Sequence, residues 1–150
     1  MASEPPRPLW QRKQDTLARL SNDVDAWVAS ADSDGLAYLV PLSFLWYDQT
    51  LTLVTPESSR TGRNLRAAGR VRLAIGPTRD VVLIDGTVEV FSAETVPADL
   101  ASAFAAKLWD PREEAVSYAY FRVTPHRIRA WREENELADR DLMRNGNWLA

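Results

Sequence analysis

The densest run of like charge in this sequence lies between Ser58 and Arg79, in the stretch SSRTGRNLRAAGRVRLAIGPTR. It contains six arginines and no Asp or Glu, although the whole chain has a formal net charge of -3. A guanidinium group donates paired hydrogen bonds to a carboxylate or a phosphate. The local excess of arginine therefore indicates either a binding site for an anion or a solvated helix that is rich in arginine.

A short helix is predicted over residues 60–68, because a serine at position 58 or 59 can cap its start and Gly69 can end it. The N-terminus of a helix presents unpaired backbone N–H groups and a partial positive charge, which together favour an anion. Arg60 and Arg63 lie three residues apart, so both can project from one side of the first turns. The predicted anion cradle consists of Thr55, Ser58, Ser59, Arg60, Thr61, Arg63 and Asn64. The later residues Arg66, Arg70 and Arg72 are expected at the surface or beside acids elsewhere.

A second feature is Pro41, which lies inside the apolar segment YLVPLSFLW. Proline has no N–H group, so sheets accept it at edges, ends or bulges. We therefore expect a break in the hydrogen-bond ladder, where backbone groups of Val40, Leu42 and Ser43 face a ligand. The alternative is an edge strand or a β-bulge without a ligand.

The composition excludes several kinds of catalytic site. The chain has no cysteine, and His126 is its only histidine, expected in a surface turn after Pro125. Disulfides, cysteine nucleophiles, Ser-His-Asp triads and metal sites with several histidines therefore lack the necessary residues. No catalytic side chain is assigned, and an enzyme of this composition depends on the chemistry of a bound cofactor.

The composition also limits the partners. The sequence pI is about 5.2, and no Phe, Tyr or Trp lies between residues 58 and 79, which argues against a nucleic-acid-binding surface. The chain has no apolar run near 20 residues and no secretory h-region at its start, so we expect a cytoplasmic protein without a membrane span.

Short apolar segments separated by turn signals predict a mainly β domain over residues 1–150, with a loose arm over 1–8 and a charged tail over 132–150. Helices are predicted near 9–21, 60–68 and 97–108, the first with Trp10, Leu17 and Leu20 on one face. The short spacings favour antiparallel neighbours in a small closed barrel. The predicted strands cover residues 24–31, 36–47, 51–55, 71–75, 81–91 and 118–124, with 127–131 extending or following the last.

These segments together resemble the flavin- and deazaflavin-binding split β-barrel family, the superfamily of pyridoxamine 5'-phosphate oxidase. The family pattern has a strand with a central proline, then Thr-x-x-x-Ser-x-Lys-x-Arg-Asn-Leu, then an Arg-Val strand. The matching residues are VPLSFLW, Thr55, Ser59, Arg63, Asn64, Leu65, Arg70 and Val71, and the similar segment order extends over about residues 9–131. The family lysine falls on Thr61, so either Arg60 supplies the charge or Ser59, Thr61, Arg63 and the backbone hold the anion without it.

The resemblance implies a six-stranded antiparallel split β-barrel of the FMN-binding type, forming a homodimer with two cofactor sites at the interface. The cofactor ring would lie along the strand of Pro41, and its phosphate would meet the predicted anion cradle. Trp131, or the tail around Trp148, is a candidate to complete the pocket of the partner subunit. The alternative role for both tryptophans is packing in the core or between subunits.

The cofactor implied by the resemblance is either FMN or the deazaflavin F420, whose phosphodiester and oligoglutamate tail are strongly anionic. The row of arginines favours F420. The expected function is hydride transfer between the reduced deazaflavin and an unsaturated or quinone-like organic acceptor. The alternatives are an FMN-binding pyridoxamine 5'-phosphate oxidase-like protein and a non-catalytic carrier of flavin, F420 or haem.

Overall fold

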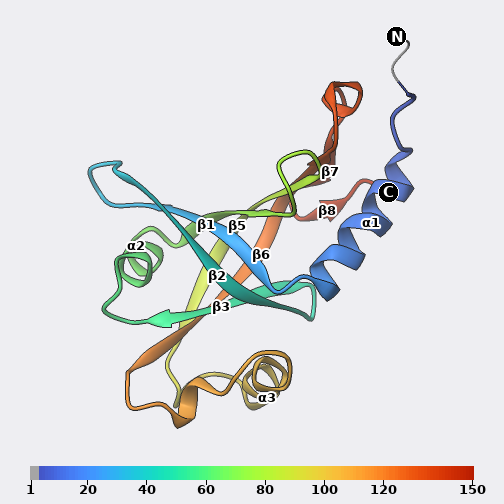
Figure 1. Cartoon of the computed structure of the whole chain (residues 1–150). Helices are drawn as coiled ribbons and strands as arrows, with labels where there is room; N and C mark the ends of the chain where they lie inside the picture. The colour runs from blue at the N-terminus through green and yellow to red at the C-terminus, as the bar shows by residue number, and fades with distance from the viewer. Residues whose placement is uncertain (1–3) are drawn as a thin grey trace.

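Six antiparallel strands form a closed β-barrel in the computed structural model, which describes residues 4–150 (Figure 1). They occur in the sequence order and close to the positions predicted, so the mainly β split-barrel prediction is confirmed. The strands are β1 (Asp25–Ala31), β2 (Ala37–Tyr47), β3 (Thr50–Pro56), β4 (Arg70–Ile75), β5 (Val81–Phe91) and β6 (Tyr118–Trp131). The helices are α1 (Leu9–Asn22), α2 (Arg60–Ala68) and α3 (Ala98–Lys107), which match the three predicted helices.

The barrel closes because its first and last strands pair. The strand order is β3-β2-β1-β4-β5-β6, and β3 pairs with β6 in antiparallel register, with Leu53 opposite Phe121 and Val54 opposite Tyr120. This pairing removes the free sheet edges that an open six-stranded sheet would expose along the paired segments.

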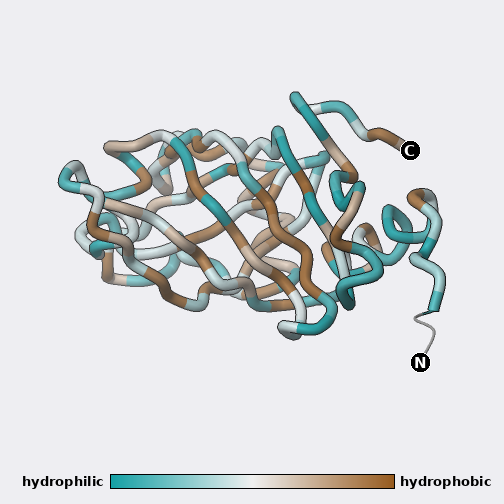
Figure 2. Tube along the Cα trace, turned by 90° about the horizontal axis from the view of Figure 1, so that it is seen from above, coloured by the Kyte–Doolittle hydropathy of each residue, from teal (hydrophilic) through white to brown (hydrophobic). Residues whose placement is uncertain are grey.

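The core follows from the two-residue period of the strands. On β4, Val71, Leu73 and Ile75 are buried while Arg70 and Arg72 point outward. The same alternation appears as brown and teal segments along the strands in Figure 2. A second apolar cluster forms where Leu100 and Phe104 of α3 pack against Tyr120 on the outside of the barrel. A strand therefore contributes to two cores when both of its faces are covered.

Helix α2 connects two strands that are not neighbours in the barrel. Strand β3 lies between β2 and β6, whereas β4 lies between β1 and β5. The connection must cross an end of the barrel, and α2 covers this end with Leu65 fully buried in the barrel core. The topology thereby fixes where the predicted anion cradle lies.

Three details of the ends of the chain differ from the predictions. Trp10 lies on the exposed side of α1, 58% exposed, while Leu20 is buried as expected. The tail contains a short 3-10 turn and the hairpin of β7 (Asp141–Arg144) and β8 (Asn147–Trp148), which extends the sheet from β6. Of the predicted loose arm, residues 1–3 lie outside the described residues, and Arg7 is held firmly by the tail.

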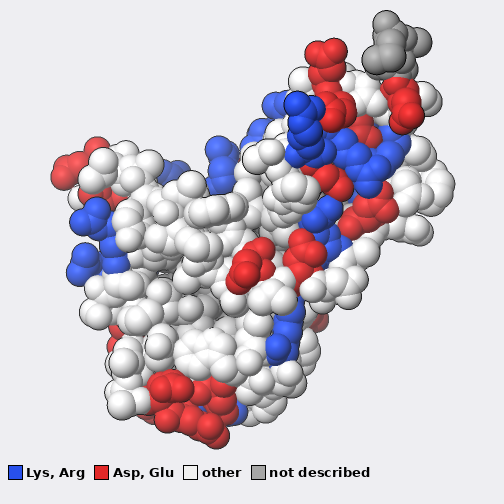
Figure 3. All heavy atoms as spheres, viewed as in Figure 1, with Lys and Arg blue, Asp and Glu red and all other residues white. Residues whose placement is uncertain are grey.

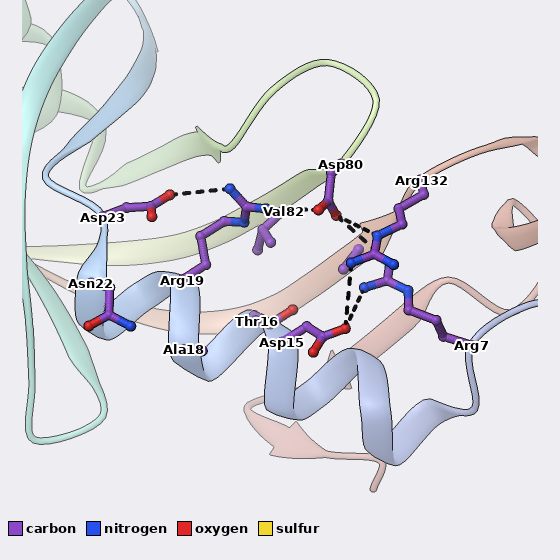
Figure 4. A pocket seen from close by; sticks show the side chains of 11 residues that line it. Arg7, Asp15, Thr16, Ala18, Arg19, Asn22, Asp23, Asp80, Val82 and Arg132 are labelled. Carbon is purple, nitrogen blue, oxygen red and sulfur yellow. Dashed lines mark hydrogen bonds and ion pairs between the residues drawn. The ribbon is translucent and has the colours of Figure 1, made fainter.

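The contact between arm and tail is a buried ion pair. Glu136 is 2% exposed and accepts three hydrogen bonds of 2.8–2.9 Å from Arg7, plus one of 2.8 Å from the backbone N–H of Arg132. Arg7 also contacts Asp15 of α1 at 2.9 Å, and Arg19 contacts Asp80 at 2.8 Å, around a cavity of about 330 Å³ (Figure 4). Figure 3 shows the mixed charges of this end of the molecule beside the mostly uncharged surface over β2 and β3. The charged side chains around the cavity pair with one another, so we assign them a structural role in joining the arm, α1 and the tail.

Glu136 should make the stability of the fold depend on acid pH. Its hydrogen bonds with Arg7 lower the pKa of the Glu136 carboxyl from 4.5 to about 2. The carboxylate therefore stabilises the folded state above pH 4.5, and this contribution is lost as the pH falls from 4.5 towards 2. The substitution Glu136→Gln should reduce the free energy of unfolding by about 3 kcal/mol at pH 7. Urea denaturation at several pH values measures this, and the difference from wild type should shrink towards pH 2.

The matched control is Glu134→Gln, because Glu134 lies exposed in the same 3-10 turn. Its free energy of unfolding should stay within about 0.5 kcal/mol of wild type. A Glu136→Gln difference that is the same at pH 7 and pH 2 would contradict the role of the ion pair.

Candidate functional site

The start of α2 has the features predicted for an anion cradle. Ser59 is the N-cap residue, and its Oγ accepts the N–H of Gly62 at 3.0 Å. Gly69 ends the helix with φ 67°, a left-handed conformation that favours glycine. Among residues 4–150, no acceptor takes the N–H groups of Arg60 and Thr61. The helix therefore offers two free backbone donors at its positive end.

Half of the predicted cradle faces inward and positions the helix. Thr55, Thr61 and Asn64 are 2–6% exposed. Thr55 Oγ1 lies 3.2 Å from Ser59 Oγ, and Asn64 Nδ2 donates to Ser30 Oγ at 3.1 Å, which ties α2 to the end of β3 and to β1. These side chains bring the cradle together but present little surface to a ligand.

The other half of the cradle faces outward. Ser58, Arg60 and Arg63 are exposed. The Arg63 side chain donates to the carbonyl oxygen of Ser58 at 3.1 Å, and the guanidinium of Arg60 lies 5.2 Å from the centre of the Tyr38 ring. Stacking on an aromatic ring restricts the guanidinium without using its hydrogen-bond donors. Arg60 is thus held near the helix start with its donors free.

The six arginines of the stretch divide into two groups. Arg66 pairs with Glu57, Arg72 with Asp85 and Arg79 with Glu133, which confirms the predicted structural role of Arg66 and Arg72. The remaining three have no ion pair with an acid in the part of the chain that the structure describes: Arg60, Arg63 and Arg70. Two of these three lie at the start of α2, so the positive charge there is uncompensated.

The predicted break at Pro41 is wrong. Strand β2 pairs with β1 without a shift in register, and Pro41 lies opposite Trp27. Proline is accepted because β2 pairs with β3 only from Phe44 onward, which leaves the other side of Pro41 without a neighbouring strand. Pro41 therefore lies on an unpaired edge of β2, as in an edge strand.

The side chains around Pro41 also lie differently from the prediction. Val40 and Leu42 pack against the barrel core, and the Ser43 hydroxyl donates to Asp25 at 2.9 Å. The amide N–H of Phe44 donates to Val24, so in an unbroken antiparallel ladder the backbone groups of Val40 and Leu42 also face β1. The surface open to a ligand is the outward one, with Leu39 and Pro41.

Within one chain, Trp131 lies far from the cradle. It lies at the end of β6, whereas Thr55 of the cradle pairs with Ala119, twelve residues back along the same strand. At about 3.3 Å per residue the separation along β6 is roughly 40 Å. The Arg140 guanidinium lies over the Trp131 ring at 4.9 Å. Within one chain, Trp131 therefore does not contact the cradle.

Residues 4–150 contain no group of three or more His, Asp or Glu side chains that could hold a metal ion. No helix in the same range has the length and apolar character needed to cross a membrane. The cytoplasmic location stays a prediction.

The barrel and the position of α2 define a split β-barrel with helical additions. Residues 15–132 match the family described as pyridoxamine 5'-phosphate oxidase, and the chain belongs to this family. No curated protein matches the chain in sequence.

Solved structures share this fold at low sequence identity. A putative pyridoxamine 5'-phosphate oxidase from Listeria innocua has a TM-score of 0.65 and 17% identity, covering 81% of this chain and 98% of its own. An F420 reductase has a TM-score of 0.59 and 18% identity, covering 74% of this chain and 93% of its own. A FAD-binding protein from Mesorhizobium loti has a TM-score of 0.58 and 21% identity, covering 77% and 90%. At these sequence identities the similarities establish the fold. They do not identify a cofactor for this chain.

The cap at Ser59 can be tested by its effect on stability. The substitution Ser59→Ala removes the acceptor for the Gly62 N–H and the contact with Thr55, so the free energy of unfolding should fall by about 1 kcal/mol. Urea denaturation measures the change. Ser58→Ala is the matched control, because the exposed Ser58 side chain makes no hydrogen bond within residues 4–150. Equal losses in both variants would remove Ser59 from the capping role.

Proposed function

We propose that this protein binds F420 and transfers a hydride between the reduced deazaflavin and an unsaturated or quinone-like organic acceptor. The observation that supports this most directly is the uncompensated charge at the start of α2. Arg60 and Arg63 are exposed, have no acidic partner in residues 4–150, and lie beside two free backbone N–H groups. Such an arrangement suits a phosphate or phosphodiester group.

The residues present fit this group. Arg60, Arg63, the Ser58 hydroxyl and the free N–H groups would hold the phosphodiester, and Tyr38 would keep the Arg60 guanidinium in place. The outward surface of Leu39 and Pro41 would support the ring. When bound, F420 supplies the hydride chemistry, and the chain binds, orients and shields the reactants from water. No side chain is assigned a proton-transfer role.

The choice of F420 over FMN rests on charge. A single phosphate needs one or two guanidinium groups, whereas a phosphodiester with an oligoglutamate tail can use several over a longer distance. Arg60 and Arg63, which have no acidic partner in residues 4–150, and the free N–H groups beside them therefore favour the longer anion. The F420 reductase that shares the fold supports the same choice. FMN binding in the manner of pyridoxamine 5'-phosphate oxidase is the second candidate, and a non-catalytic carrier is the third.

We also propose that two copies of the chain form the complete site. Trp27, Leu39 and Pro41 form an exposed apolar patch on β1 and β2, where Trp27 is 51% and Leu39 59% exposed. Burying such side chains against a second copy would be favourable. A second copy would also allow Trp131 to reach the cradle, which it cannot do within one chain.

The charge at the cradle should determine cofactor affinity. Arg60→Ala or Arg63→Ala should each weaken F420 binding by about 1–3 kcal/mol, because each removes a charge-assisted hydrogen bond. Thr61→Ala should weaken it less, since Thr61 is 2% exposed. Quenching of fluorescence in parallel titrations with F420 and FMN measures both affinities and identifies the preferred cofactor.

The control for these titrations is Arg112→Ala, which removes an arginine that pairs with Asp110 in a loop. Its affinity should equal that of wild type. Unchanged F420 affinity in the Arg60→Ala, Arg63→Ala double variant would remove the cradle from the site. Tight binding without turnover on any acceptor would favour the carrier over the enzyme.

The dimer can be tested through the apolar patch. Trp27→Arg should convert a dimer into a monomer, because it places a charge in the proposed interface. Light scattering after size-exclusion chromatography measures the mass. Val116→Arg is the control, since Val116 is equally exposed, at 52%, in the loop before β6. A wild-type monomer would overturn the dimer proposal, and a dimer that survives Trp27→Arg would place its interface elsewhere.

A further inference from the structure

A second hollow lies beside the last turn of α2. It has a volume of about 770 Å³ and lies between the turn that joins β1 to β2 and the outer surface of β4, β5 and β6. Its lining includes the small residues Ala29, Ala31 and Gly86, and it reaches the last residue of α2, Ala68. The groove adjoins the cradle, because its lining residue Ser30 accepts a hydrogen bond from Asn64 at 3.1 Å, but neither Arg60 nor Arg63 lines it.

A β-bulge turns the chain's only histidine into this groove. On β6, Arg127 pairs with Asp85 of β5, but the next residue of β5, Gly86, pairs with Pro125. His126 is therefore the extra residue of a bulge, exposed and part of the groove lining. Bulges commonly redirect a side chain beside a functional site.

The bulge is held by its surroundings. A Cβ atom at Gly86 would lie 2.6 Å from a methyl group of Val123 and 2.7 Å from the carbonyl oxygen of Thr124, so only glycine fits opposite it. The carbonyl oxygen of His126 accepts the N–H of Gly146 at 2.9 Å, from the turn between β7 and β8. The backbone of His126 is thus fixed from both sides while its side chain stays exposed.

Three guanidinium groups line the groove with His126. Arg72 pairs with Asp85, and Arg127 pairs with Asp141 at 3.1 Å, while Arg70 has no acidic partner in residues 4–150. The lining contains two acids. Asp85 is shared with Arg72, and Asp32 accepts backbone N–H groups within its own turn. Arg70 is therefore the free cation of the groove.

The surroundings add to the positive character of this surface. Arg129 lies behind Asp85 at 3.6 Å. Burial lowers the pKa of the Arg129 guanidinium, and the nearby arginines at 127, 72 and 140 lower it further. Cations outnumber the carboxylates available to them on this part of the barrel.

We propose that this groove is a binding site for a small organic anion. Arg70 and Arg127 hold its carboxylate or phosphate group, His126 supplies a further polar contact, and the small lining residues Ala29, Ala31 and Gly86 leave room for its flat apolar body. The volume exceeds that of a free inorganic anion, and the mixture of small apolar lining residues with a few convergent polar groups is typical of small-molecule sites. The proposal does not rest on F420 binding, because Arg70, Arg127 and His126 lie outside the cradle.

The sole histidine provides a direct reporter of this site. In untagged protein, the His126 ring gives the only imidazole signals in a proton NMR spectrum. Titration with benzoate and with phenyl phosphate at constant pH and without cofactor should shift these signals in a saturable way. Benzamide has the shape of benzoate without its charge. Its dissociation constant should be at least ten-fold higher than that of benzoate. The anion with the lower dissociation constant, benzoate or phenyl phosphate, shows whether the site prefers a carboxylate or a phosphate.

Variants of Arg70 test which group binds the anion. Arg70→Ala should raise the dissociation constant at least five-fold, and Arg70→Lys should restore part of the loss, because it keeps the charge without the guanidinium fork. Arg79→Ala is the matched control, since Arg79 is exposed, pairs with Glu133 and lies outside the groove.

Two results would overturn the proposal. Equal shifts with benzoate and benzamide would mean that no anion site is present. Equal dissociation constants for Arg70→Ala and Arg79→Ala would mean that the groove does not provide the binding group. F420 titrations of the same variants keep this test separate from the proposed function, because Arg70→Ala can lose benzoate binding whether or not the protein binds F420.

Discussion

The pairing of β3 with β6 is the constraint on which the rest of this molecule depends. It closes six strands into a barrel and separates β3 from β4, which follow each other in the sequence. The intervening helix must then cross an end of the barrel. Leu65 enters the core, and Thr61 and Asn64 face inward. The exposed side of the same short helix is left with Arg60 and Arg63, so the barrel topology decides where the positive charge points.

The arginines of this protein serve two physical roles. Most form ion pairs that join distant segments, and the pair of Arg7 with Glu136 connects residues 129 positions apart. Such pairs are satisfied and contribute to the fold. A few lack an acid in residues 4–150 and lie where the chain has also left backbone donors or a hollow surface, as at Arg60 and Arg70. Composition alone cannot separate the two roles, because both use the same side chain.

Much of the fold could be predicted because local patterns encode it. The alternation in VRLAI, the cap at Ser59 and the stop at Gly69 each depend on neighbouring residues. The unpredicted features depend on contacts between segments far apart in the sequence. Glu136 is buried only because Arg7 reaches it. Pro41 is tolerated only because β3 does not extend past it.

The candidate site was predicted in part for the same reason. The sequence places Thr55, Ser59, Arg60 and Asn64 near one helix start, and the structure brings them together there. The sequence alone could not show which of these residues face the core, because that depends on how α2 crosses the barrel. The bulge at His126 was missed because it is defined by the pairing of Gly86 with Pro125 across two strands.

The departure at position 61 from the family pattern has a physical consequence. Thr61 is 2% exposed, so a cation at this position would have to extend a long side chain out of a buried backbone site. A threonine fits the inward position without that cost. The preceding residue lies about 100° away around the helix, on the exposed side, where Tyr38 supports the Arg60 guanidinium. With the charge at position 60 instead of 61, one residue packs the helix and its neighbour carries the positive charge. A lysine at position 61 would have to do both. Thr61 packs the helix against the barrel, and the Arg60 guanidinium stays exposed, where the proposed anion would bind.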